Sequence, residues 1–572
     1  MTEDITSGFT PCAKAPIQGI TRVEPSHYID PGNCEAMLNI GLFFDGTNNN
    51  IETDKPNLGH SNVARLADAY LEDKPKGFYP IYIPGVGTHF PEIGEKGTST
   101  LGSAFAVGCE ARVLYGLLAA FNVIHRFSFS GQLLFTPPQI KALCRNNSVS
   151  FPEDMEPLAE LDLREGLRIP DILGHGRRER FLKEQAAALE QKLAANGRPH
   201  IKECFIDVFG FSRGAAEARV FCHWLDQLLS GGKLAGVPIR LRFLGLMDTV
   251  ASAGFWGSLG SAATNTTRGH TGWAEATFLH IPASVENCVH MVAMHELRKN
   301  FPLDEIGIGG ALPPHCQQFA YPGSHSDVGG GYLPGELGIS LGRTPAESDA
   351  LKLAQIPLNH MLECAIGAGV PSDKTLALIT LTGYDPFAIA PQLQQAYDDF
   401  LEISTMRPRP LRDWLQPYLS WRWQMRNNYP SLGHVLKANG DDKTLLLEAN
   451  ARFVRAAEIM RFHGDVDQSR GFLAAFKGLI GPKLTDARYR QENLSALDPE
   501  APALLDIAQK AAQTPEVLAR FFDGYIHDSL AGFARDLVEP TGHWRYRKGF
   551  RGNDEATLAQ REDAQTDIGA RG

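Results

Sequence analysis

Residues 203–220, ECFIDVFGFSRGAAEARV, give the strongest indication of the fold of this chain. The first part of this stretch, Glu203 to Phe209, is short, apolar and rich in β-forming residues, which predicts a strand. From Arg213 onward the spacing is helical, so the strand turns directly into a helix. A G-x-S-x-G pentapeptide at such a turn raises its serine above the sheet. Ser212 is therefore a candidate nucleophile; because the chain has 56 glycines, a plain Gly-rich turn is the alternative.

A carboxylate follows the next predicted strand. Residues 239–246, IRLRFLGL, have strand character, and Asp248 stands just beyond them. In α/β-hydrolases the chain order of the catalytic groups is serine, then acid, then histidine. The carboxyl ends of neighbouring parallel strands meet at one edge of a sheet, so Asp248 is the candidate acid. A turn or helix-capping residue is the alternative reading of Asp248.

The candidate base is His325, which stands in the small-residue loop PGSHSDVGGGY, residues 322–332. The chain has 18 histidines, and His325 is distinguished by this loop and by its place in the order. Asp327 lies two residues farther on and could orient the imidazole instead of Asp248. His527 and Asp528 form a second histidine–aspartate pair, which either repeats this chemistry or packs the end of the chain onto the core.

A nucleophilic serine also needs donors for the oxyanion of the tetrahedral intermediate. One is expected to be the backbone N–H of Arg213, the residue after the nucleophile. For the second, the backbone N–H of Asp45 or Gly46 is favoured, because these residues end an early strand. The rival source is the segment Gly85-Val86-Gly87.

Five short motifs carry a specific resemblance. They are LFFDGTN (42–48), PGVGT (84–88), GFSRGAAEAR (210–219), FLGLMDTVAS (243–252) and YPGSHSDVGGGY (321–332). Together they resemble the α/β-hydrolase domain of the first family of bacterial type VI secretion lipase effectors. The resemblance covers roughly residues 38–332 and returns at 525–529 and 544–547. Residues 295–298, HELR, depart from the family's pattern but lie outside its triad, which falls on Ser212, Asp248 and His325.

This resemblance implies a phospholipase A, a carboxylic ester hydrolase of the A1 or A2 type. Its substrate would be a membrane phospholipid, cut at the sn-1 or sn-2 ester without a cofactor or a metal ion. Its protein partners would be a type VI spike protein or adaptor for delivery and a cognate immunity protein. The alternatives are a cytoplasmic esterase acting on soluble esters and a non-catalytic binding protein that keeps the hydrolase fold.

The expected organisation has three parts. Residues 1–36 form an N-terminal arm, and 37–340 form the α/β-hydrolase domain, with an insertion at about 137–200. Within that domain, residues 254–273 are either a lid or a buried loop. Residues 341–572 are mainly helical, and 520–552 are expected to pack back on the core. In this third part, residues 411–425 carry Trp414, Tyr418, Trp421 and Trp423, which suit either a membrane contact or a core.

Composition limits the partners and the compartment. A formal charge of −11 disfavours nucleic acid as a partner. The nine cysteines are scattered singly, without metal-binding spacing, as in chains that fold in a reducing cytosol. The first residues, MTEDITSGFTPC, contain no apolar signal segment. We therefore expect synthesis in the cytoplasm without a signal peptide, and the resemblance implies secretion into the periplasm of target cells.

Overall fold

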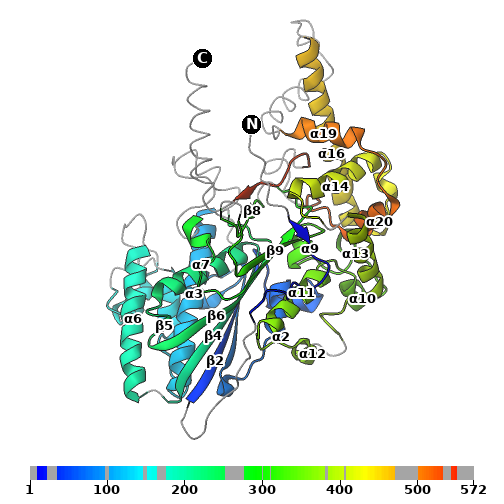
Figure 1. Cartoon of the computed structure of the whole chain (residues 1–572). Helices are drawn as coiled ribbons and strands as arrows, with labels where there is room; N and C mark the ends of the chain where they lie inside the picture. The colour runs from blue at the N-terminus through cyan, green and yellow to red at the C-terminus, as the bar shows by residue number, and fades with distance from the viewer. Residues whose placement is uncertain are drawn as a thin grey trace, which may run out of the picture.

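The computed structural model describes residues 9–21, 35–96, 102–145, 151–163, 175–196, 198–251, 276–298, 301–308, 311–380, 384–404, 407–469, 500–532 and 543–550 (Figure 1). The predicted lid, residues 254–273, lies outside them.

An eight-stranded sheet runs through the centre of the described structure (Figure 1). Its order is β1-β9-β7-β6-β4-β2-β3, with β5 attached to β6. Every pair along this order is parallel, and only the β5–β6 pair is antiparallel. The strands are β1 Thr10–Pro11, β2 Glu35–Phe44, β3 Phe78–Ile83, β4 His200–Phe211, β5 Lys233–Leu234, β6 Val237–Met247, β7 Cys288–Ala293 and β9 Cys316–Tyr321.

Helices cover both faces of this sheet (Figure 1). One core lies between the sheet and helices α3 (Gly102–Ser128), α4 (Pro137–Arg145), α6 (His175–Asn196) and α7 (Arg213–Leu228). The other lies between the sheet and helices that include α2 (Asn62–Ala69) and α11 (Gln355–Gly367). This arrangement explains why the second halves of β2 and β4 are mostly apolar, since a parallel sheet is buried on both sides. The α/β-hydrolase class predicted from the sequence is confirmed.

The polar segment between β2 and β3 includes helix α2, Asn62–Ala69. Ser61 caps this helix by accepting the N–H of Ala64 at 3.1 Å. The helices up to the candidate histidine are α1 Ile51–Asp54, α2 Asn62–Ala69, α3 Gly102–Ser128, α4 Pro137–Arg145, α5 Met155–Ala159, α6 His175–Asn196, α7 Arg213–Leu228 and α9 His325–Gly329.

The described residues after 340 are mostly helical. Those at 355–380 lie beside the sheet and pack on its core, whereas most of those from 391 onward gather toward the upper right of the view (Figure 1). None of the described helices has both the length and the apolar character needed to cross a membrane. These later helices are α10 Pro345–Ala350, α11 Gln355–Gly367, α12 Lys374–Thr380, α13 Pro391–Ser404, α14 Leu411–Met425, α15 Gly433–Lys437, α16 Gly440–Ser469, α19 Ala501–Lys510 and α20 Glu516–Tyr525.

The aromatic residues of α14 belong to the core, which is one of the two alternatives that the sequence left open. Trp414, Tyr418, Trp421 and Trp423 are each exposed by 6% or less. Phe522 of α20 packs edge-on against Tyr418, with ring centroids 5.5 Å apart. Since the rings are covered by protein, they are not available to lipid in this conformation.

The end of the described chain returns to the hydrolase part. Strand β10, Gly549–Phe550, pairs in parallel with β8, Leu303–Asp304, in a separate two-stranded sheet. Trp544 is 1% exposed and stacks on Phe453 of α16, with ring centroids 4.6 Å apart. A segment more than 200 residues beyond β9 is thereby held next to the sheet.

Candidate active site

Ser212 stands on a sharp turn from β4 into α7, which we call the elbow. Its φ and ψ of 58° and −123° lie in a region that a non-glycine residue rarely adopts. The elbow has no room for larger neighbours: a Cβ on Gly210 would come 2.4 Å from the carbonyl oxygen of Gly214. A Cβ on Gly214 would come 2.2 Å from the carbonyl oxygen of Phe44. Both glycines of the pentapeptide are thus required by close backbone approach.

The register of the sheet brings Ser212 next to Asp248. Phe211 of β4 is paired with Met247 of β6, so the residues that follow them are neighbours at the carboxyl edge. The N–H of Ser212 donates to the carbonyl oxygen of Met247 at 3.0 Å, and the N–H of Val250 donates to that of Ser212 at 3.1 Å. The two strand ends therefore hold each other in place.

His325 contacts Asp248 directly. Its Nδ1 lies 2.5 Å from Oδ2 of Asp248, and both side chains are buried. The other ring nitrogen, Nε2, is buried and makes no hydrogen bond within the described part of the chain. An imidazole whose Nδ1–H is held by a carboxylate has its Nε2 left for proton exchange.

Asp327, the alternative acid, has other partners. Its Oδ2 accepts the N–H of Ser324 at 2.8 Å, which caps helix α9. Its Oδ1 lies 2.6 Å from Nδ1 of His527. Asp528 contacts Arg422 at 3.0 Å. In this structure, then, Asp327 does not orient His325, and His527 and Asp528 do not form a pair with each other.

The His325 ring lies between two phenylalanines. Phe211 packs against it with ring centroids 4.6 Å apart, and Phe301 approaches edge-on at 4.8 Å. Burial lowers the pKa of His325, and contact with Asp248 partly offsets this effect. The neutral imidazole, the form able to accept a proton, is therefore favoured.

Asp248 stays ionised although it is fully buried. Burial by itself raises the pKa of this carboxyl, but Arg547 and His325 outweigh it and hold the pKa well below its ordinary range. The guanidinium of Arg547 donates to Oδ1 and Oδ2 at 2.7 and 2.8 Å. The N–H of Ala293 donates to Oδ1 at 2.9 Å.

Glu296 supports the backbone of the histidine. Its Oε2 accepts the N–H of His325 at 3.1 Å, and its Oε1 accepts the hydroxyl of Ser529 at 3.1 Å. Burial raises the pKa of Glu296, but a two-pronged contact with Arg298 outweighs it and lowers the pKa to about 2. Glu296 and Arg298 belong to the HELR segment, which therefore serves the site although it departs from the family's pattern.

The prediction for the second oxyanion donor is wrong in this conformation. The N–H of Asp45 donates to the carbonyl oxygen of Ile83 at 3.0 Å, and that of Gly46 donates to Oδ1 of Asp45 at 2.7 Å. Both amides are therefore engaged within the loop. Asp45 is a turn residue, and Tyr82 also donates to its carboxylate at 2.5 Å.

The rival segment fixes the same loop. The N–H of Gly85 donates to the carbonyl oxygen of Asn49 at 2.9 Å, and a Cβ on Gly85 would come 1.7 Å from the carbonyl oxygen of Gly46. Arg213 begins helix α7, and the first amides of a helix have no partner within it. Its guanidinium donates to Oγ1 of Thr47 at 3.0 Å, which brings Thr47 to the elbow.

Three neighbours of the site were missed at the level of sequence. Arg547 and Ser529 belong to C-terminal segments that were singled out only by resemblance. His290 of β7 accepts the N–H of Thr249 at 3.1 Å through Nε2, directly after Asp248. A histidine inside an apolar strand was the available signal, but the same pattern is typical of an ordinary core histidine.

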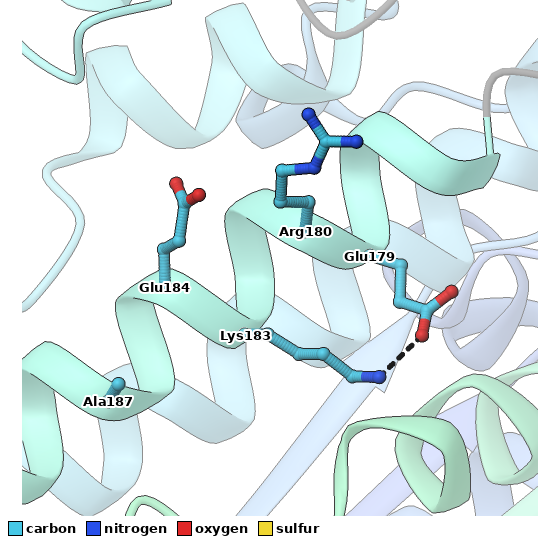
Figure 2. Close-up of a pocket in the computed structure, with 5 residues that line it drawn as sticks. All are labelled: Glu179, Arg180, Lys183, Glu184 and Ala187. Atoms are coloured by element: carbon cyan, nitrogen blue, oxygen red, sulfur yellow. Dashed lines mark hydrogen bonds and ion pairs between the residues drawn. The ribbon is translucent and has the colours of Figure 1, made fainter.

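Figure 2 shows a hollow elsewhere, along the helix α6. It is lined by Glu179, Arg180, Lys183, Glu184 and Ala187. Lys183 pairs with Glu179 at 2.6 Å, and none of the five residues belongs to the predicted site. Across the described ranges, no three His, Cys, Asp or Glu side chains gather as a metal ion would need.

Comparison with known proteins gives a family. Residues 232–364 match the family described as T6SS, phospholipase effector Tle1-like, catalytic domain. This match includes Asp248 and His325, while Ser212 lies before it. No curated protein matches the chain.

Two solved structures resemble the chain to different degrees. A crystal structure of an uncharacterized protein from Pseudomonas aeruginosa aligns with a TM-score of 0.65 and 23% identity, over 91% of this chain and 80% of that one, and supports the fold alone. The structure of the Tle1 effector bound to the VgrG spike of the type 6 secretion system aligns with a TM-score of 0.32 and 18% identity, over 67% of this chain and 83% of that one. The second superposition is too poor to carry an argument. The family match confirms the resemblance drawn from the motifs. This chain carries a domain similar to the catalytic domain of the Tle1-like phospholipase effectors of type VI secretion, which are lipolytic hydrolases.

Proposed function

We propose that this chain is a serine esterase that hydrolyses the acyl esters of membrane phospholipids through Ser212, His325 and Asp248. The observation that carries the proposal is the contact of 2.5 Å between His325 and Asp248 beside the serine of the elbow. A serine, an imidazole and a buried carboxylate in this arrangement are the parts of acyl-transfer catalysis.

Each residue has one role in the reaction. The hydroxyl oxygen of Ser212 attacks the ester carbonyl carbon while Nε2 of His325 takes the hydroxyl proton. The imidazolium then gives this proton to the leaving alcohol, and an acyl-enzyme remains. A water molecule, deprotonated by the same imidazole, releases the fatty acid. Asp248 holds the imidazole in the required tautomer and offsets its charge.

The oxyanion needs two donors, and the amides of Asp45, Gly46 and Gly85 are already engaged within the loop. We assign the first to the backbone N–H of Arg213, at the start of helix α7. Since the amides of Asp45 and Gly46 are engaged, we assign the second to the backbone N–H of Thr47. Its side chain already contacts Arg213, which supports this assignment.

The family description supports a role as a secreted toxin. The matched family is described by its type VI secretion phospholipase effectors, so we propose delivery by a spike protein or an adaptor into the periplasm of a rival bacterium. The producing cell would need a cognate immunity protein, because neighbouring cells of the same strain would deliver the same toxin to it. The position of the cleaved ester, sn-1 or sn-2, is an outcome of the experiment below.

Purified protein on phospholipid vesicles tests this function. We expect lysophospholipid and free fatty acid as products, and Ser212→Ala should lower the rate at least about 10³-fold, because triad residues act as a unit. Products from vesicles with different acyl chains at the two positions distinguish sn-1 from sn-2 cleavage. Activity on short soluble esters without activity on vesicles would favour the soluble esterase. Full activity in Ser212→Ala would exclude this nucleophile.

A further inference from the structure

The segment 543–550 lies against the candidate active site although it is almost 300 residues beyond Asp248 in sequence. Its strand β10 pairs Gly549 with Leu303, and the N–H of Leu303 donates to the carbonyl oxygen of Lys548 at 2.8 Å. This pairing fixes the backbone on both sides of Lys548. Arg547, the residue before it, is thereby directed at the end of strand β6.

All three nitrogens of the Arg547 guanidinium donate hydrogen bonds. Its two terminal nitrogens donate to the two carboxylate oxygens of Asp248 at 2.7 and 2.8 Å, and its Nε donates to the carbonyl oxygen of Phe301 at 2.8 Å. The side chain is 3% exposed, and that of Asp248 is 0% exposed. A two-pronged contact of this kind fixes the plane of a carboxylate as well as its charge.

Fixing that plane has a consequence for the imidazole. With Oδ1 held by Ala293 and Arg547, the remaining oxygen Oδ2 is directed at Nδ1 of His325. Arg547 also holds the backbone of Phe301, whose ring contacts the same imidazole from its edge. The orientation of His325 therefore depends on Arg547 through two separate contacts.

We propose that Arg547 is a positioning residue for the Asp248–His325 pair, so that the segment 543–550 completes the active site. This inference rests on the proposed function in one respect, namely that His325 acts as the base. It goes beyond that function because it assigns Arg547, in the segment 543–550, a role in the active site.

The charges around His325 give this role a signature in the pH dependence. Two anions, Asp248 and Glu296, and one cation, Arg298, act on the imidazole, and Arg547 pairs with Asp248 behind it. His290 beside Asp248 is neutral, because burial lowers its pKa to about 3. Asp327 on the histidine's own helix is paired with His527. Without Arg547, the two carboxylates face only one cation, Arg298. The excess negative charge stabilises the protonated imidazole and so raises the pKa of His325.

The test compares full-length Arg547→Ala, Arg547→Lys and Lys548→Ala. Lys548 is the exposed neighbouring cation, and its backbone pairing survives the substitution. In Arg547→Ala we expect kcat to fall roughly 10²-fold, as for a misplaced catalytic group. The acid limb of the kcat/KM profile should move up by about one pH unit. In Arg547→Lys the acid limb of the kcat/KM profile should lie close to its wild-type position, because lysine keeps the positive charge. Its kcat should be only partly restored, because lysine cannot make the two-pronged contact with the carboxylate. Lys548→Ala should match the wild type.

Two readouts separate this inference from the proposed substrate. The first is hydrolysis of a soluble p-nitrophenyl ester. The second is the pH-dependent rate at which a fluorophosphonate labels Ser212, followed by intact mass. If vesicles are not hydrolysed while Ser212 is still labelled, the substrate proposal fails and the role of Arg547 is still measured. An unshifted acid limb in Arg547→Ala, or equal losses in the alanine and lysine variants without a shift, would overturn the inference.

Discussion

At Asp248, four hydrogen bonds converge on one buried carboxylate. They come from Ala293, from His325 and, twice, from Arg547. A buried charge persists only when its lone pairs are satisfied and its charge is compensated, and both conditions are met here. The carboxylate can therefore keep the imidazole tautomer fixed throughout a reaction cycle.

The first prediction compares the two carboxylates that the sequence left open. Asp248→Asn should lower kcat by about 10⁴-fold with the fold retained, because an amide favours the wrong imidazole tautomer. Asp327→Asn should have a smaller effect, since Asp327 caps helix α9 and pairs with His527. Initial rates on a saturating ester measure kcat, and thermal unfolding checks the fold. The reverse order of severity would make Asp327 the orienting acid.

At the scale of elements, the elbow depends on how closely helix α7 approaches strand β2. A Cβ on Gly214 would lie 2.2 Å from the carbonyl oxygen of Phe44 and 2.3 Å from that of Asp45. These are backbone atoms, so relief would require β2 and α7 to separate. The loop with the proposed oxyanion donor Thr47 begins at the same point.

We therefore predict that Gly214→Ala destabilises the protein by about 3 kcal/mol or more, because a clash with backbone cannot be relieved by a rotamer change. The matched control is Gly440→Ala at the start of α16, where nothing lies within 4 Å of the added Cβ. That control should change stability by less than about 1 kcal/mol. Midpoints of urea unfolding compare the two variants. Equal midpoints would mean that the elbow tolerates a wider separation.

The elements that the sequence predicted well are those with a strong local pattern. The strand, turn and helix around Ser212 were predicted from residues 203–220, and β4 and α7 meet at this serine. Helix α2 was missed because its segment is polar, and its helix is stabilised by a Ser61 cap and by packing on the sheet. The amides of Asp45 and Gly46 were misassigned because their partners depend on the exact course of the loop.

Contacts between residues far apart in the sequence could not be predicted from such local patterns. Arg547 reaches Asp248 only because β10 pairs with β8, and two-residue strands leave no mark in hydropathy. For the same reason the aromatic helix α14 could not be assigned to core or membrane until its packing against α20 was known.

At the scale of the whole molecule, the helical C-terminal region and the sheet form one site. Helix α20 is followed by His527 and Ser529, which contact Asp327 and Glu296. The segment that carries Arg547 then contacts Asp248. Any partner that displaced the end of the chain would disturb the acid, the histidine helix and the HELR segment together. The C-terminal region is therefore tied to catalysis in our proposal.

The last prediction concerns the compartment in which this activity does harm. If the chain is an effector, expression in a bacterial cytosol should be tolerated, whereas fusion to a periplasmic export signal should stop growth. The reason is that the target of such a toxin is the membrane as it is reached from the periplasm of a rival. Growth curves of the two expression strains measure this difference.

Ser212→Ala and Arg547→Ala in the exported form give the controls. The serine variant should abolish toxicity, and the arginine variant should weaken it in proportion to its loss of kcat. Co-expression of an immunity protein encoded by a neighbouring gene should also restore growth. Unimpaired growth in both compartments, with ester hydrolysis intact in the purified protein, would retain the hydrolase chemistry and remove the effector role. If the exported Ser212→Ala variant is still toxic, the toxicity does not come from ester hydrolysis at Ser212. Its cause would then be another property of the exported protein, such as its charge or its fold.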